Sequence, residues 1–134
     1  MPRPSTILAS TFFTGAGLMH FARPDFFESI VPDWFPDAKL ANQVSGAAEL
    51  VFGLGLLSPT TRKPAAYGLV ALTALVFPAN IDMAINNVEV KPAGGEMTRS
   101  VGTAEGPARM VNWLRLPLQL PLGYGLWRLA RRAN

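Results

Sequence analysis

The sequence predicts an all-α fold, a bundle of four transmembrane helices with both termini in the cytoplasm. Four stretches of the 134-residue chain are each about as long as the roughly 20 apolar residues of a membrane-spanning helix. These stretches are residues 4–22, 40–61, 64–81 and 110–127. Two of them carry a single charge, Glu49 and Arg115, and the other two carry none. The remaining charges gather in the connections, so none of these helices has the charged face of a soluble helix.

The elements follow in order along a single membrane domain. We expect spans at about residues 5–22, 40–58, 65–85 and 110–129. An interfacial segment, residues 23–39, is rich in aromatic rings, which favour the boundary between membrane and water. An outer loop, residues 86–109, is rich in Gly, Glu, Thr and Ser, and we interpret it as exposed. A short hairpin over the bundle is the alternative for this loop.

Basic residues set the predicted orientation. The two termini and the turn at residues 60–64 together carry six Lys or Arg and no acid. The connections on the other side carry seven acids among five basic residues. The positive-inside rule therefore places both termini of this multi-pass protein in the cytoplasm.

Composition excludes several kinds of function. Without cysteine the chain holds no disulfide, thiolate zinc site or iron–sulfur cluster, and its single histidine excludes a bis-histidine haem. We expect no metal and no resident cofactor. A quinone is the one cofactor that this composition leaves possible. The net charge of +3 suggests nucleic acid, but the basic residues at the ends of spans fit membrane topology better. A soluble protein with a large apolar core is the alternative.

Polar side chains inside the predicted spans form the candidate site. Glu49 shares one helix face with Asn42, and Arg115 shares another with Gln119. A rise of about 1.5 Å per residue places Glu49 and Gln119 roughly 13 Å below the outer boundary and Arg115 roughly 7 Å below it. The other candidates lie shallower than Glu49. The predicted cluster in the outer half of the bilayer consists of His20, Glu49, Asn80, Asp82, Arg115 and Gln119.

Pairing within this cluster offsets the cost of burying charge. Glu49 is the natural partner of Arg115, and Asp82 is a second candidate. Gln119, one turn deeper than Arg115, is placed to bond with Glu49. Because residues 80 and 82 diverge by about 200° on an ideal helix, we expect Asn80 to face inward and Asp82 to reach the rim.

Three interpretations of the cluster stay open. It is a set of structural contacts that holds the helices together, a site for a small lipophilic or quinone-like molecule, or a path for protons or ions. Conduction also needs polar groups in the inner half, and these are few. His20 is the lone group that titrates near neutral pH, and such a residue is more often structural than catalytic. We assign no catalytic residue, and the residues leave open whether the protein is an enzyme.

Five short motifs follow one another along most of the chain outside residues 86–109. They are GLMHFARP at 17–24, IVP at 30–32, SGAAEL at 45–50, PANI at 78–81 and RLPLQ at 115–119. In order and spacing they resemble the DoxX-like family of small bacterial membrane proteins. The resemblance implies a four-helix membrane bundle in the bacterial inner membrane, and it supports Glu49, Asn80, Arg115 and Gln119 as the residues that matter. Some members of that family are linked to thiosulfate:quinone oxidoreduction, and others to membrane assemblies that handle oxidative stress.

Taken together, these features predict a membrane subunit or scaffold of a redox-related complex. The alternatives are a subunit of a quinone-linked oxidoreductase, or a carrier or binder of a small lipophilic molecule. We expect membrane lipid around the chain and either a protein partner or a second copy beside it, and no nucleic acid.

Overall fold

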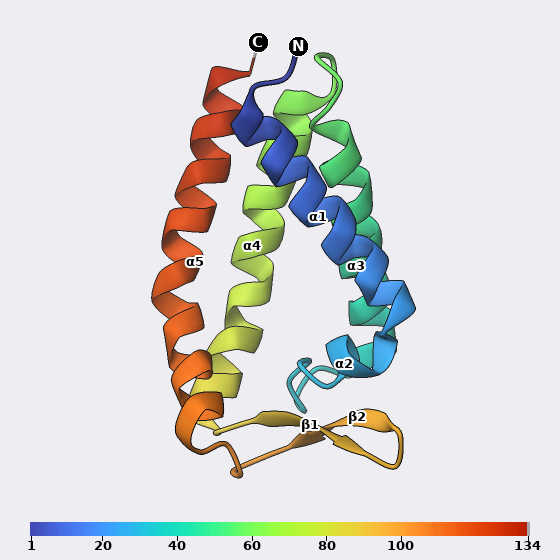
Figure 1. Ribbon diagram of the computed structural model, residues 1–134, viewed down its shortest axis with the longest axis vertical. Helices are drawn as coiled ribbons and strands as arrows, with labels where there is room; N and C mark the ends of the chain where they lie inside the picture. The colour runs from blue at the N-terminus through green and yellow to red at the C-terminus, as the bar shows by residue number, and fades with distance from the viewer. Residues whose placement is uncertain (134) are drawn as a thin grey trace.

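The computed structural model describes residues 1–133, and it combines five helices with one β-hairpin (Figure 1). Four long helices run along the long axis, and α2 and the hairpin close one end, here called the hairpin end. Both chain termini and the turn between α3 and α4 lie at the other, the terminal end. The elements are α1 (Pro4–Ala22), α2 (Pro24–Glu28), α3 (Ala38–Gly55), α4 (Arg62–Ile85), β1 (Glu89–Ala93), β2 (Glu96–Ser100) and α5 (Gly106–Arg132).

The predicted all-α bundle of four transmembrane helices is wrong. The structure adds a two-stranded antiparallel sheet, and within residues 1–133 only α4 is long and apolar enough to cross a membrane. The other long helices lack charge over most of their length, but they are not apolar throughout. Ser, Thr and Gly interrupt α1, polar residues begin α3, and α5 carries Arg115 and a basic C-terminal turn. The absence of charge from a stretch is therefore weaker evidence for a membrane span than high mean hydropathy is.

Prolines and one aspartate set the helix starts. Helices α1, α2 and α5 each have a proline in the first turn, where a missing N–H costs no helical hydrogen bond. Helix α3 begins after Asp37, whose Oδ1 accepts a hydrogen bond from the Leu40 N–H at 3.0 Å. That cap ends the segment after α2 and places the face with Asn42 and Glu49 beside α1.

Two glycines bring α1 and α3 into close contact. A Cβ atom on Gly17 of α1 would lie 2.7 Å from the backbone N of Leu50 and 2.9 Å from the carbonyl O of Gly46. A Cβ on Gly46 of α3 would lie 2.5 Å from the Cβ of His20. Because neither glycine has a side chain, the two backbones approach closely, and His20 comes to lie against α3.

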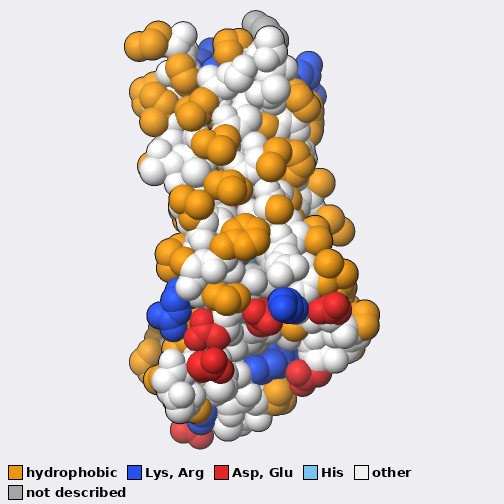
Figure 2. Space-filling view, turned by 90° about the vertical axis from the view of Figure 1, so that its right-hand side faces the viewer, with side chains coloured by type: hydrophobic (Ala, Val, Ile, Leu, Met, Phe, Trp, Pro, Cys, Tyr) orange, Lys and Arg blue, Asp and Glu red, His pale blue; other side chains and the backbone are white. Residues whose placement is uncertain are grey.

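The buried core is small and lies toward the terminal end. Its members are Phe13, Leu56, Ala65, Ala66, Leu69, Leu126 and Ala130. Many larger apolar side chains point outward instead, among them Leu75, which is 76% exposed, and Leu120, which is 70% exposed. Figure 2 shows hydrophobic side chains spread over the helical part of one face, acidic ones gathered at the hairpin end, and basic ones at both ends.

Part of the expected outer loop, residues 86–109, is a hairpin packed over the end of the bundle. Gly94 and Gly95 form its tight turn, with φ of 60° and 83°, and Ala93 pairs with Glu96 across it. The backbone N–H of Met97 donates to Asp25 Oδ2 at 2.8 Å. This bond ties β2 to α2, so the segment is held by tertiary contacts.

Candidate functional site

A hydrogen-bonded pair between α1 and α3 defines the protonation of His20. The Nδ2 of Asn42 donates to the His20 carbonyl O at 3.0 Å, so the Asn42 Oδ1 faces the imidazole, 2.7 Å from Nδ1. An amide oxygen is only an acceptor. His20 Nδ1 therefore carries a hydrogen and donates it to Asn42.

The other ring nitrogen of His20 faces Glu49. Nε2 lies 3.3 Å from Glu49 Oε2, and the ring stacks on Phe27 of α2 with centroids 3.8 Å apart. A neutral imidazole with its hydrogen on Nδ1 has a lone pair on Nε2, which would repel a carboxylate. Nε2 therefore needs a hydrogen of its own to attract Glu49, so this contact favours the imidazolium form of His20.

Glu49 also lines a cavity of about 270 Å³ between α1, α3, α4 and α5, which is open to the surface. Four of the six predicted site residues meet there, because Asn80, Arg115 and Gln119 line it as well. His20 reaches the cavity only through Glu49. The rest of the lining consists of Phe12, Phe13, Leu72, Thr73, Val76, Leu118 and Leu122. The cavity is thus an apolar space with a few polar groups, the usual composition of a small-molecule site.

The side chains of Asn80 and Gln119 are hydrogen-bonded to each other on one wall of this cavity. Asn80 Nδ2 donates to Gln119 Oε1 at 2.6 Å, and Gln119 Nε2 donates to the Thr73 carbonyl O. The Thr73 carbonyl lies one residue before the carbonyl that the ring of Pro78 displaces from the helical ladder. This wall joins α4 to α5, and the expected bond between Gln119 and Glu49 is replaced by the one to Asn80.

Within residues 1–133, the one hydrogen-bond acceptor of Arg115 is a sulfur atom. Arg115 is half-buried, and its Nη1 lies 3.2 Å from the thioether Sδ of Met83, a weak acceptor. No ion pair within residues 1–133 includes Arg115. The expected ion pair with Glu49 is not formed, although both side chains line the same cavity, because Glu49 lies against His20.

Asp82 belongs to a different network at the hairpin end. Its Oδ2 accepts from Arg99 Nη2 at 2.7 Å, and its Oδ1 accepts from Asn86 at 2.8 Å. Arg99 of β2 also lies 3.0 Å from Asp33 and donates to the Ser29 carbonyl O. Asp82 is therefore a residue of the hairpin junction, and Arg99, which sequence reasoning missed, is its centre.

Asp25 carries the clearest pKa shift outside the long helices. A hydrogen bond from Arg23, and then one from the Met97 N–H, lower the pKa of the Asp25 carboxyl to about 2. The same contact raises the pKa of Arg23. Asp25 thus stays ionised over the physiological range and holds β2 against α2.

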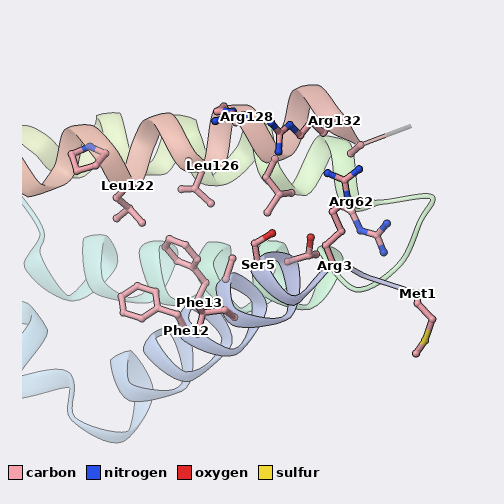
Figure 3. A pocket seen from close by; sticks show the side chains of 17 residues that line it. Met1, Arg3, Ser5, Phe12, Phe13, Arg62, Leu122, Leu126, Arg128 and Arg132 are labelled. Carbon is pink, nitrogen blue, oxygen red and sulfur yellow. The ribbon is translucent and has the colours of Figure 1, made fainter.

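A larger groove continues from the cavity toward the terminal end (Figure 3). Its volume is about 790 Å³, and it shares Phe12, Phe13 and Leu122 with the cavity. An elongated ligand can therefore extend from the polar groups around Arg115 along the apolar wall of α1 and α5. Elsewhere, within residues 1–133, no three His, Cys, Asp or Glu side chains gather as a metal site.

Comparison with known proteins assigns the chain to a family without a described activity. The model of that family, described as a domain of unknown function (DUF8561), matches residues 8–130. The resemblance to the DoxX-like family is wrong, since the match is to this other family. A search of the curated proteins and of the solved structures finds no match.

Proposed function

We propose that this chain, which belongs to the family described as a domain of unknown function (DUF8561), is a membrane-inserted protein that binds a small lipophilic molecule in the Arg115 cavity. The exposed apolar surface supports the membrane part of the proposal. Only 17% of the apolar window in α4 is buried within the protein, whereas the core helix of a soluble protein is mostly buried. The outward side chains of α1, α3 and α5 are also largely apolar. Lipid would cover this surface without the cost of exposing it to water.

The half-buried guanidinium of Arg115 carries the binding part of the proposal. A guanidinium has five N–H donors, and this one faces a cavity with a thioether sulfur as its recorded acceptor. Buried charges are normally paired, because desolvation is costly. A ligand with an acceptor oxygen at its polar end would satisfy Arg115 inside the cavity.

The charge of the cavity favours the same kind of ligand. An imidazolium at His20 balances the charge of Glu49, so Arg115 is the one uncompensated charge of the cavity within residues 1–133. A carbonyl or carboxylate oxygen is attracted to that charge, and the neighbouring groove takes an apolar tail. A quinone, with a carbonyl on its ring and an isoprenoid chain, is one molecule of this class. A fatty acid, with its carboxylate, is another.

The predicted role in a redox-related complex has lost its main support. It rested on the resemblance to the DoxX-like family, which the family match replaces. Nothing in residues 1–133 favours a redox partner over another protein. The role as a scaffold, the protein partner and the second copy remain predictions.

Native mass spectrometry of the purified protein tests the binding proposal. The probes are a short-chain ubiquinone and decanoic acid, each titrated into wild type, Arg115→Met and Arg109→Met. Arg109 is an exposed arginine of the same helix, so its variant removes the same charge outside the cavity. Loss of a charge-assisted hydrogen bond should weaken binding about ten- to a hundredfold in Arg115→Met. Arg109→Met should bind like wild type.

The outcomes separate the ligand classes. Binding of the quinone alone selects a carbonyl head group, and binding of decanoic acid alone selects a carboxylate. Equal affinity of Arg115→Met and wild type for both probes, or no binding by wild type, contradicts a ligand site at Arg115.

Alkaline carbonate extraction of cell membranes tests insertion separately. The protein should remain in the membrane pellet and should enter solution only with detergent. Release by carbonate alone would contradict insertion, whatever the binding results.

A further inference from the structure

The groove at the terminal end has an apolar floor between two helices that diverge. Helix α1 contributes Leu8, Phe12 and Phe13, and α5 contributes Leu122 and Leu126. Figure 3 shows Phe12 and Phe13 on one wall facing Leu122 and Leu126 on the other. Leu8, Phe12 and Leu122 are exposed, so this floor would lie open to water without an occupant.

Four arginines surround the mouth of this groove, and no acidic side chain of residues 1–133 lines it. They are Arg3, Arg62, Arg128 and Arg132. Arg62 is held in place because its Nε donates to the Leu56 carbonyl O at 2.8 Å and its Nη2 to the Leu57 carbonyl O at 3.2 Å. Figure 3 places Arg3 and Arg62 on one side of the mouth and Arg128 and Arg132 on the other.

Charge is also unevenly distributed along the long axis of the molecule, with the terminal end basic. The terminal end holds six Lys or Arg and no Asp or Glu side chain within residues 1–133. Eight of the nine acids lie at the hairpin end, and the ninth is Glu49. A basic mouth on a basic end attracts anions over a distance of about a Debye length.

The length of the groove matches one leaflet of a bilayer. Leu122 and Arg132 are ten residues apart on α5, which is about 15 Å of helix. The hydrocarbon core of a bilayer is about 30 Å thick, so one leaflet spans about half of that. An acyl chain on the apolar floor would thus place its head group at the arginines.

We propose that this groove binds an anionic phospholipid, with the phosphate among Arg3, Arg62 and Arg132 and one acyl chain along Phe12 and Leu122. The proposal needs the membrane insertion proposed above but not the ligand of the Arg115 cavity, and the tail of a long ligand there would compete with the acyl chain for Phe12 and Leu122. Charge complementarity favours an anionic lipid over a zwitterionic one, because a zwitterionic head group has no net charge to compensate the positive charge of the arginines. The bound lipid also completes the wall between α1 and α5.

Lipid retention in native mass spectrometry tests this proposal. Protein in mixed micelles receives phosphatidylglycerol or phosphatidylcholine with the same acyl chains. Wild type should retain phosphatidylglycerol in preference to phosphatidylcholine. The double variant Arg3→Gln/Arg132→Gln should lose that preference, with phosphatidylglycerol affinity lowered about thirtyfold, since the two basic residues near a membrane surface contribute similar amounts. Arg62 is left unchanged because it also caps α3.

The control removes the same charge from the same end. Lys63→Gln/Arg131→Gln changes two basic residues that do not line the groove, and it should retain phosphatidylglycerol like wild type. Gly125→Leu fills the groove at a position where an added Cβ meets nothing within 4 Å, and it should expel the lipid without lowering the Tm.

Three results would overturn the groove as a lipid site. The first is equal retention of the two lipids by wild type. The second is equal loss in the two double variants, which would assign the effect to the general charge of the terminal end. The third is displacement of phosphatidylglycerol by inorganic phosphate as effectively as by the lipid itself, which would make the arginines a site for a free anion. The Arg115→Met variant should retain phosphatidylglycerol, so failure here is distinct from failure of the cavity proposal.

Discussion

Arg99 of β2 reaches into the end of the helical bundle and lies 2.7 Å from Asp82 of α4, with both side chains largely buried. The contact joins the hairpin to the longest apolar helix. The side chains are 12% and 7% exposed, so water does little to screen or replace the interaction. Together with Asp33 and Ser29, the pair makes Arg99 the centre of the hairpin junction.

Removing Arg99 should therefore destabilise the protein strongly. In Arg99→Gln the Asp82 carboxylate stays buried without its cation, and the free energy of unfolding should fall by about 3–5 kcal/mol. Chemical unfolding of the purified protein measures this change. Lys91→Gln is the matched control on the other strand, because it breaks the exposed Lys91–Glu89 pair, which should cost about 1 kcal/mol or less. Equal stabilities of the two variants would contradict a buried junction.

Two glycines of α1 should respond in opposite directions to the same substitution. Gly17→Ala places a Cβ 2.7 Å from the Leu50 backbone N, so α1 and α3 must separate, at a cost of about 1–3 kcal/mol. Gly15→Ala meets nothing within 4 Å and should gain about 0.5–1 kcal/mol from helix propensity. Thermal melting of both variants measures the difference. If Gly17→Ala melts at or above the wild-type temperature, α1 and α3 do not pack as closely as described.

The long helices were predictable from sequence because the connections hold most of the charge. The predicted spans overlap α1, α3, α4 and α5, so the helices themselves were predicted correctly. Within residues 1–133, however, only α4 is long and apolar enough to cross a membrane, so the prediction of four membrane spans was wrong. Charge counts treat Ser, Thr and Gly as neutral, whereas mean hydropathy counts them against a span. The hairpin was predicted only as an alternative because its strands are short and polar. Its contacts through Arg99 and Asp25 depend on residues far away in sequence.

Part of the site was predictable for a similar reason. Helical spacing brought Asn80, Arg115 and Gln119 toward a common interior, and they line one cavity with Glu49. The partner of Glu49 was not predictable from charge alone, because attraction between opposite charges predicts Arg115 as the partner. Close packing of α1 on α3 through Gly17 and Gly46 decides the matter by placing His20 against Glu49.

Acid should weaken the hairpin end through Asp25. Its pKa is about 2 in the folded protein against an ordinary 3.8, so the unfolded chain binds the proton more readily. The stability that Asp25 contributes is therefore complete above about pH 4 and is lost as the pH falls through about 2. Melting temperatures of wild type and Asp25→Asn should differ by a constant amount at higher pH and converge below about pH 4. Curves that stay parallel down to pH 2 would show that Asp25 is not held by Arg23 and Met97.

The single histidine makes the proton of the His20 site directly observable. Nitrogen-15 labelling of histidine gives signals from one residue only, because the chain has no other. Nδ1 should stay protonated across the whole pH range in which Nε2 changes, since Asn42 Oδ1 accepts its hydrogen at 2.7 Å. In Asn42→Leu that acceptor is gone, and the neutral ring should move its hydrogen to Nε2, where Glu49 accepts it. Glu49→Gln is the control, because it keeps Asn42 and should leave the hydrogen on Nδ1. A wild-type ring with its only hydrogen on Nε2 would contradict the orientation of Asn42 and, with it, the charge balance between His20 and Glu49 that leaves Arg115 uncompensated in the cavity.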